Sequence, residues 1–313
     1  MLRYIAGRVL TTIPVMGVVA VLVFAILRLT PGDPAAIIAG DSATSQQLEQ
    51  MRVSMGLDKP IYVQFPLWAL QILHGDLGTS LISGVPVSGM IADRIGPTIA
   101  LSVTIIVFSI VTAIPLGILA AWKQGTMIDR AVSALSVLGF SVPVFVTGYL
   151  LILLLSISLG WLPVQGYRPM SGGFWPFLER LVLPTFALST AYIALIFRIT
   201  RTSVLEVMGE DYIRTARAKG LNERAVLVRH ALSNAAVPII TIIGLGITNL
   251  MSGVVVTESV FNLPGLGRLV VEAVLARDYP LIQGLILLFS FAFITINLIV
   301  DVLYVLFDPR IRY

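Results

Sequence analysis

Six long apolar runs limit what this chain can fold into. They cover residues 9–27, 98–121, 131–158, 181–197, 236–257 and 281–300. A helix needs about 20 apolar residues, within a range of ~17–25, to cross the hydrocarbon core of a bilayer. Each run is long enough, and only 12% of the residues are charged, against about 25% in soluble domains. The sequence therefore predicts an all-α polytopic membrane protein with six transmembrane helices.

The first run has two interpretations. Arg3 and Arg8 precede it, as basic residues precede the apolar core of a cleavable signal peptide. However, the run is longer than the ~7–15 apolar residues of such a core, and no cleavage site of small residues follows it. We therefore expect residues 1–30 to form a membrane helix that is retained.

The distribution of charge predicts how the chain is oriented. Six spans place both ends on one side, and most of the 21 Lys and Arg fall in the ends and loops of that side. In segment 31–96, on the other side, acidic residues outnumber basic ones. Because basic residues concentrate in cytoplasmic loops, we expect both termini in the cytoplasm. The expected organisation is a first helix at 1–30, an extracytoplasmic segment at 31–96, a five-helix core at 97–307 with a cytoplasmic loop at 201–233, and a cytoplasmic tail at 308–313.

The extracytoplasmic segment 31–96 is too long for a simple turn. Its start and stop residues predict short helices within 42–57, 59–75 and 85–96. The first begins near Ser45 and ends before Gly56. The second is entered at Pro60 and closed by Gly75. We expect a small helical subdomain outside the membrane.

Several motifs of enzymes are missing from the sequence. It contains no Cys, no HExxH and no GxxxxGK[ST] loop, which would hold the phosphates of a nucleotide. His74 and His230 fall on opposite sides of the membrane in the expected topology. We therefore expect no metal site, no catalytic residues and no cofactor in this chain, and a membrane enzyme is the weakest interpretation.

Polar residues inside the spans have two interpretations. Asp301 is the one charged residue that we expect within a span, with Asn297 on the same helical face. It could relay protons, but a structural hydrogen bond near the helix end is favoured. Thr248, Asn249 and Ser252 could line a pore or bond between helices. A stand-alone secondary transporter, the alternative function, would need more buried carboxylates.

The basic loop 201–233 predicts a helical hairpin. Asp211 can cap a short helix, and Gly220 stands where a helix often ends in left-handed geometry. Asn222 can begin a second helix that runs toward Pro238. The loop would therefore form a helix–turn–helix at the cytoplasmic face.

The small residues of this loop are more informative than its charge. Basic residues alone indicate a cytoplasmic loop, and we do not expect nucleic-acid binding. Ala216 and Ala218, beside Gly220, give a compact surface. A partner's cleft could hold that surface without ordering long side chains.

The stretch DYIRTARAKGL, 211–221, resembles the cytoplasmic EAA loop of bacterial ABC importer permeases. The form is that of the dipeptide/oligopeptide/nickel group. In the general pattern, Glu-Ala-Ala is followed by three residues, Gly, nine residues and Ile-x-Leu-Pro. Ala216, Gly220 and Leu232 match it. The Glu, Ile and Pro are replaced here, a departure that the peptide-type group shares.

Further matches to this group extend along the chain. They are LTPGDPA (29–35), GLDKPIYVQF (56–65), GDLGTS (75–80), LGWLP (159–163), FNLPGLGRL (261–269), RDYPLIQ (277–283) and DPRIR (308–312). The large extracytoplasmic loop and the tail resemble the first of the group's two permease subunits.

The resemblance implies the type I ABC importer permease architecture in the bacterial inner membrane. It implies four kinds of partner besides lipid: a second homologous permease, two cytoplasmic ATPases that bind ATP and Mg, and an extracytoplasmic solute-binding protein. It assigns the contact with the ATPases to Asp211, Tyr212, Arg214, Thr215, Ala216, Arg217, Ala218, Lys219, Gly220 and Leu221. Peptides are the expected substrate, with glutathione, nickel chelates or oligosaccharides as alternatives.

Overall fold

The structure is a computed structural model that describes residues 2–29, 35, 44–54 and 57–307. The expected tail 308–313 and most of the LTPGDPA stretch lie outside these residues, as does Gly56. Within the described residues the chain is helical, and an isolated bridge joins Thr79 to Pro86.

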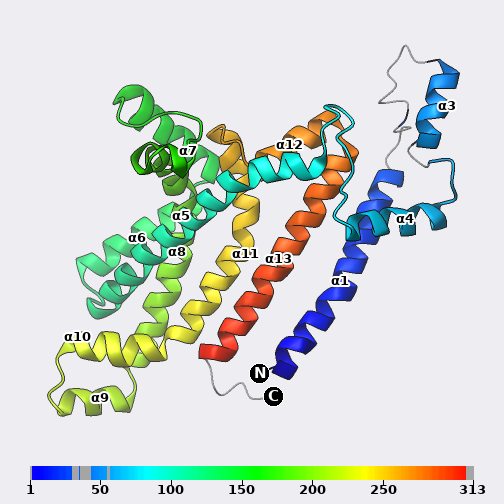
Figure 1. Ribbon diagram of the computed structural model, residues 1–313. Helices are drawn as coiled ribbons and strands as arrows, with labels where there is room; N and C mark the ends of the chain where they lie inside the picture. Colours follow the sequence, from blue (N-terminus) through cyan, green and yellow to red (C-terminus); the bar gives the residue numbers. More distant parts are fainter. Residues whose placement is uncertain (1, 30–34, 36–43, 55–56, 308–313) are drawn as a thin grey trace. The chain divides into compact units, whose positions relative to one another are not determined.

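The helices follow one another along the chain with short connections (Figure 1). Their bounds are α1 Leu2–Leu29, α3 Ser45–Ser54, α4 Ile61–Leu73, α5 Val87–Trp122, α6 Met127–Ser141, α7 Val144–Leu151, the π-helical η1 Ile152–Ser158, the 3₁₀ turn η2 Met170–Gly172, α8 Phe174–Met208, α9 Asp211–Ala218, α10 Glu223–Ala225, the π-helical η3 Val226–Leu232, α11 Ala236–Val260, α12 Leu266–Ala276 and α13 Tyr279–Phe307.

Four helices are long and apolar enough to cross a membrane, namely α5, α8, α11 and α13. The third apolar run forms a fifth span only as a broken one, because α6 and the helix formed by α7 and η1 meet at an angle of 103°. Val142 is extended there and Pro143 begins the next helix, since the residue before a proline disfavours helical geometry. The first run lies in α1, whose described apolar part, Leu10–Ala25, is shorter than the other spans.

The helices expected in the extracytoplasmic segment are confirmed in two places and wrong in a third. Helix α3 begins at Ser45, and α4 follows Pro60 and ends before Gly75, whose φ is +82°. The separate short helix expected within 85–96 does not exist, because α5 runs unbroken from Val87. Pro97 removes one hydrogen bond inside α5 without ending the helix.

The chain divides into two compact units. The larger unit contains residues 96–268 and the chain from 295 onward, and the smaller contains residues 2–95 and 269–294. In the smaller unit, Phe24 of α1 packs against Phe65 and Trp68 of α4, with ring centroids 5.4 and 5.5 Å apart. There Asp278 is buried and accepts hydrogen bonds from Ser80 Oγ and from the Leu81 N–H.

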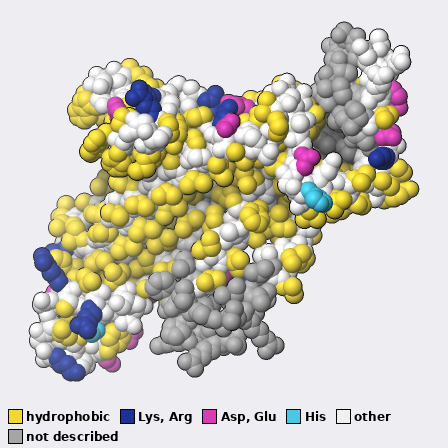
Figure 2. All heavy atoms as spheres, viewed as in Figure 1, with side chains coloured by type: hydrophobic (Ala, Val, Ile, Leu, Met, Phe, Trp, Pro, Cys, Tyr) yellow, Lys and Arg dark blue, Asp and Glu magenta, His cyan; other side chains and the backbone are white. Residues whose placement is uncertain are grey.

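Glycines allow the helices of the larger unit to approach closely. A Cβ at Gly117 of α5 would lie 2.7 Å from Thr200 Cβ of α8, and a Cβ at Gly253 of α11 would lie 2.6 Å from Leu188 Cδ1 of α8. Hydrophobic side chains cover most of the visible surface of these helices, while Lys and Arg gather near α9 and α10 (Figure 2). The spans of this unit are therefore packed against one another without large gaps at these crossings.

Candidate functional site

The loop between α8 and α11 forms the expected helical hairpin at one end of these two helices (Figure 1). Helix α9 ends at Gly220, whose φ of +81° favours glycine. Asn222 then caps α10, because its Oδ1 accepts a hydrogen bond of 2.8 Å from the Ala225 N–H. The sequence located both the turn and the second helix start correctly.

The expected helix cap was wrong by one residue. Glu210 occupies the N-cap position of α9, and Asp211 is the first helical residue. The Asp211 carboxylate is exposed and accepts a bond of 3.1 Å from Arg214 Nη1. A negative charge in the first turn still favours the helix through its dipole, so two adjacent acidic residues left the cap ambiguous in the sequence.

One face of α9 packs against the chain itself. Ile213, Ala216 and Val226 are buried, and Val207 and Met208 at the end of α8 pack against them. Positions three residues apart share a helical face, which explains why Ile213 and Ala216 point the same way. Ala216 therefore belongs to the inner core of the hairpin, whereas the sequence suggested a surface built from both alanines.

The opposite face of α9 is exposed and polar. The remaining expected residues, all exposed, are Asp211, Tyr212, Arg214, Thr215, Arg217, Ala218, Lys219, Gly220 and Leu221. Arg217 Nε also donates to Glu223 Oε1 at 2.8 Å, which joins α9 to α10. Exposed ion pairs contribute only ~0–1 kcal/mol to folding, so these pairs shape the surface more than they hold the fold.

Tyr212 lies beside this surface. Partial burial, and then the negative charge of Glu210, raise the pKa of its phenol. Both effects disfavour the phenolate, so Tyr212 stays neutral near neutral pH.

An ion pair that the sequence analysis missed connects α6 to α8. Arg201 Nε and Nη2 donate to the two carboxylate oxygens of Asp129 at 2.6 and 2.8 Å. The Asp129 carboxylate also accepts from the Gly125 N–H at 2.9 Å, and its side chain is 6% exposed. The signal in the sequence was an acidic residue among basic ones at the start of a span.

The polar residues of α11 occupy different environments. Thr248 Oγ1 lies 3.3 Å from Asn297 Oδ1 and donates to it, so it links α11 to α13. Asn249 and Ser252 are exposed on a common face of α11. Asp301 is half-buried on α13, one turn beyond Asn297. The structure therefore brings Thr248 together with Asn297 and places the other two on a surface.

Glu258 is a buried carboxylate that the sequence analysis also missed. It is fully buried, and it accepts hydrogen bonds from Thr98 Oγ1 at 2.6 Å and from the Arg268 N–H at 3.0 Å. A Cβ at Gly265 would overlap the carboxylate, so this glycine lets the following turn close over it. Glu258 directly follows the apolar run 236–257, but α11 continues to Val260.

Asp301 is therefore not the only buried or half-buried carboxylate. Glu258, Asp129 and Asp278 are each more deeply buried than it. The scarcity of carboxylates consequently gives no argument against a secondary transporter, and the function must be decided on other grounds.

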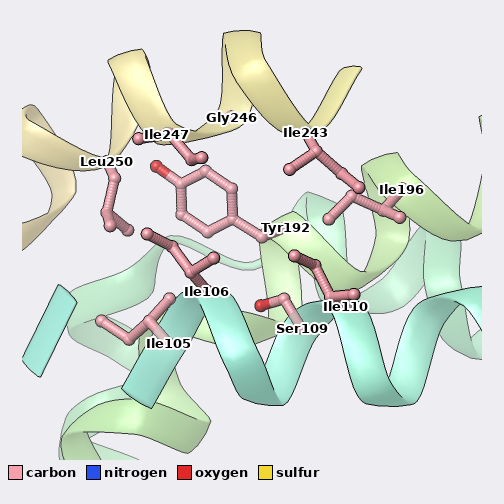
Figure 3. A pocket seen from close by; sticks show the side chains of 10 residues that line it. All are labelled: Ile105, Ile106, Ser109, Ile110, Tyr192, Ile196, Ile243, Gly246, Ile247 and Leu250. Carbon is pink, nitrogen blue, oxygen red and sulfur yellow. The ribbon is translucent and has the colours of Figure 1, made fainter. Parts of the chain in front are cut away.

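A small pocket lies among α5, α8 and α11 (Figure 3). The ring of Tyr192 fills its centre, and its hydroxyl points toward Ile247 and Leu250, while Ser109 lies near the opposite wall. The residues that line it are Ile105, Ile106, Ser109, Ile110, Tyr192, Ile196, Ile243, Gly246, Ile247 and Leu250. The lining is mostly apolar, and among the described residues no group of acidic, His or Cys side chains could hold a metal ion.

The chain matches two family models that together cover most of its length. Residues 113–313 match the binding-protein-dependent transport system inner membrane component, and residues 1–102 match the N-terminal part of the corresponding membrane component. The chain is 51% identical to a probable peptide ABC transporter permease protein, y4tP, of Sinorhizobium fredii, over 99% of both chains. It is 45% identical to the glutathione transport system permease protein GsiC of Salmonella typhi, over the full length of both.

Solved structures show the same fold. A chain of the MetNI methionine ABC transporter in an inward-facing conformation aligns with a TM-score of 0.58 and 17% identity, over 70% of this chain and 96% of that one. A chain of an amino acid ABC transporter aligns with a TM-score of 0.51. The chain therefore belongs to the binding-protein-dependent transport system inner membrane components, as an integral membrane permease of the ABC importer type.

Proposed function

We propose that this chain is the subunit through which an ABC importer moves peptides across the cytoplasmic membrane. The observation that carries the proposal is the 51% identity, over 99% of both chains, to a permease named for peptide transport. Brucella relatives named as putative peptide transport permeases share 44% identity over the full chain. Both termini and the hairpin lie in the cytoplasm, and segment 31–96 faces the solute-binding protein.

Glutathione is the second candidate substrate, supported by the 45% identity to GsiC. Uptake by the complete complex in proteoliposomes, with its binding protein supplied, separates the two. Competition of unlabelled tripeptides against labelled peptide supports the peptide proposal. Displacement by glutathione alone would replace it with the second candidate.

The hairpin is the contact with two partner ATPases, which bind ATP and Mg and carry out hydrolysis. The exposed face of α9 includes Thr215 and Ala218, which are small enough to enter a cleft. The buried face, with Ile213 and Ala216, packs against Met208 at the end of α8. Closure of the ATPases would push α9, and this packing would transfer the movement to α8.

A second, homologous permease completes the translocation path. Asn249 and Ser252 lie on an exposed face of α11 and would line that path. Thr248, bonded to Asn297, would instead hold α11 against α13. Asp301 remains a structural residue of α13 in this proposal.

Bulk on the exposed face of α9 tests the docking role. In Ala218→Trp, we expect the chain to fold and insert normally but to lose at least about tenfold of its substrate-stimulated ATP hydrolysis, because an interface core tolerates bulk poorly. Ala276→Trp is the matched control, since Ala276 is an exposed alanine of α12. Normal stimulation in Ala218→Trp would refute this docking surface.

A further inference from the structure

The ion pair of Asp129 and Arg201 has the geometry of a joint between two helices. The guanidinium and the carboxylate face each other through two bonds, of 2.6 and 2.8 Å. The side chains are 6% and 27% exposed, so water screens this pair less than it screens the exposed pairs of the hairpin. The Gly125 N–H bond fixes the carboxylate further.

A second contact holds the same two helices in the same register. A Cβ at Gly139 of α6 would lie 3.3 Å from the carbonyl oxygen of Thr190 of α8, which places the two backbones close together. The ten residues from Asp129 to Gly139 match the eleven from Thr190 to Arg201, or about 15 Å along each antiparallel helix. Helix α6 is therefore fastened to α8 at two separated points.

Both ends of this helix pair connect to elements that the mechanism uses. At the end of α8, Val207 and Met208 pack against the buried face of the hairpin. At the end of α6, the chain turns by 103° into the second half of the broken span. A displacement of α9 would thus reach α8, then α6 through the ion pair, and finally the bend near Pro143.

We propose that Asp129 and Arg201 are positioning residues that make α6 move together with α8 and the hairpin, so that the bend between α6 and α7 opens and closes with ATP hydrolysis. The inference rests on the proposed function, because it concerns how force from the ATPases enters the bundle. Neither residue contacts the substrate or the nucleotide in this account.

Substitutions that keep the side-chain size test the joint. In the reconstituted complex, Asp129→Asn should lower the amount of substrate imported per ATP by about tenfold or more, because a charged two-bond contact is lost. Arg201→Lys, which keeps the charge but not the fork, should fall in between. The exchange Asp129→Arg with Arg201→Asp should recover part of the loss.

A matched pair in the smaller unit serves as the control. Arg94 and Glu272 lie 3.5 Å apart and are 32% and 40% exposed. Glu272→Gln should leave import per ATP unchanged. An unchanged ratio in Asp129→Asn, or a fall in import and ATP hydrolysis in strict proportion to lost folded protein, would overturn the inference.

A distance measurement tests the joint without disturbing it. The chain contains no Cys, so spin labels can be attached to cysteines introduced at exposed positions. Labels at Leu135 of α6 and Phe186 of α8 should keep their distance between the nucleotide-free and ATP-trapped states. Labels at Leu135 and Tyr149 of α7 should change theirs. A change in the first distance would overturn the inference.

The two levels of failure are distinguishable. If the proposed function is wrong, the unsubstituted complex will show no substrate-stimulated ATP hydrolysis. If only the joint is wrong, the unsubstituted complex will be coupled normally, and the variants will match it.

Discussion

The two ends of α11 carry their polar residues in opposite ways. Beside its first residues, the hairpin displays Asp211, Arg214 and Arg217 at the surface, where they pair with neighbours in contact with solvent. Near its last residues, Glu258 is fully buried, with Thr98 and the Arg268 backbone as donors. Polar groups at the first end remain available to a partner, whereas those at the second are consumed by the fold.

The energetic consequences differ accordingly. An exposed ion pair gains only ~0–1 kcal/mol, because water and salt screen it. A buried carboxylate has lost its hydration, and its donors would lose their acceptor if it were removed. We therefore expect substitutions at the hairpin to change function with little change in stability, and substitutions at Glu258 to do the reverse.

The largest effect is expected at Glu258. Glu258→Ala leaves the Thr98 hydroxyl and the Arg268 N–H without their acceptor and opens a cavity, so we expect about 3 kcal/mol of destabilisation. The measurement is thermal unfolding of the purified chain in detergent. Ser259→Ala, at the adjacent exposed position, should stay within ~0.5 kcal/mol. Equal stability of the two variants would contradict the contrast between the two ends.

A smaller effect on stability, with a large effect on coupling, is expected at Gly220. No atom would lie within 4 Å of a new Cβ there, but a φ of +81° strains any β-branched residue. Gly220→Val should therefore abolish substrate-stimulated ATP hydrolysis while costing only about 1–2 kcal/mol of local stability.

Gly84→Val provides the matched strain, since Gly84 has a φ of +69° and equally open surroundings in the smaller unit. ATP hydrolysis and thermal unfolding should be measured on both variants. Loss of coupling in both would mean that strain anywhere in the chain is enough, and would remove the special role of the hairpin turn.

The smallest effect is expected at the pair of Arg217 and Glu223. Both side chains are about 40% exposed, and Glu223→Gln removes one charge without changing shape. We expect a stability change below ~0.5 kcal/mol that vanishes in high salt. Thermal unfolding at low and high ionic strength checks this. A change as large as that of Glu258→Ala would show that the hairpin depends on its exposed charges.

Local patterns in the sequence predicted the local structure well. The apolar runs marked the membrane helices, and Gly220 and Asn222 marked the turn and second start of the hairpin. The bend at Pro143 was not predicted, because a proline can either kink a spanning helix or break it. The packing around α6 and α7 decides between these outcomes.

Contacts between distant segments could not be predicted in the same way. Asp129 and Arg201 are 72 residues apart, and no local periodicity links them. Glu258 was missed because the apolar run ends one residue before it, although the nearby glycines of the following turn hinted at a close approach. The buried side of α9, with Ile213 and Ala216, was visible in the sequence as a three-residue spacing.

The most direct test of the account is photo-crosslinking from the exposed face of α9. A crosslinking residue at position 215, in membranes that import the substrate, should give an adduct that mass spectrometry identifies as a P-loop ATPase. The same residue at position 276 should give none. If position 215 yields no ATPase adduct while import is intact, the hairpin is not the contact through which ATP hydrolysis drives this permease.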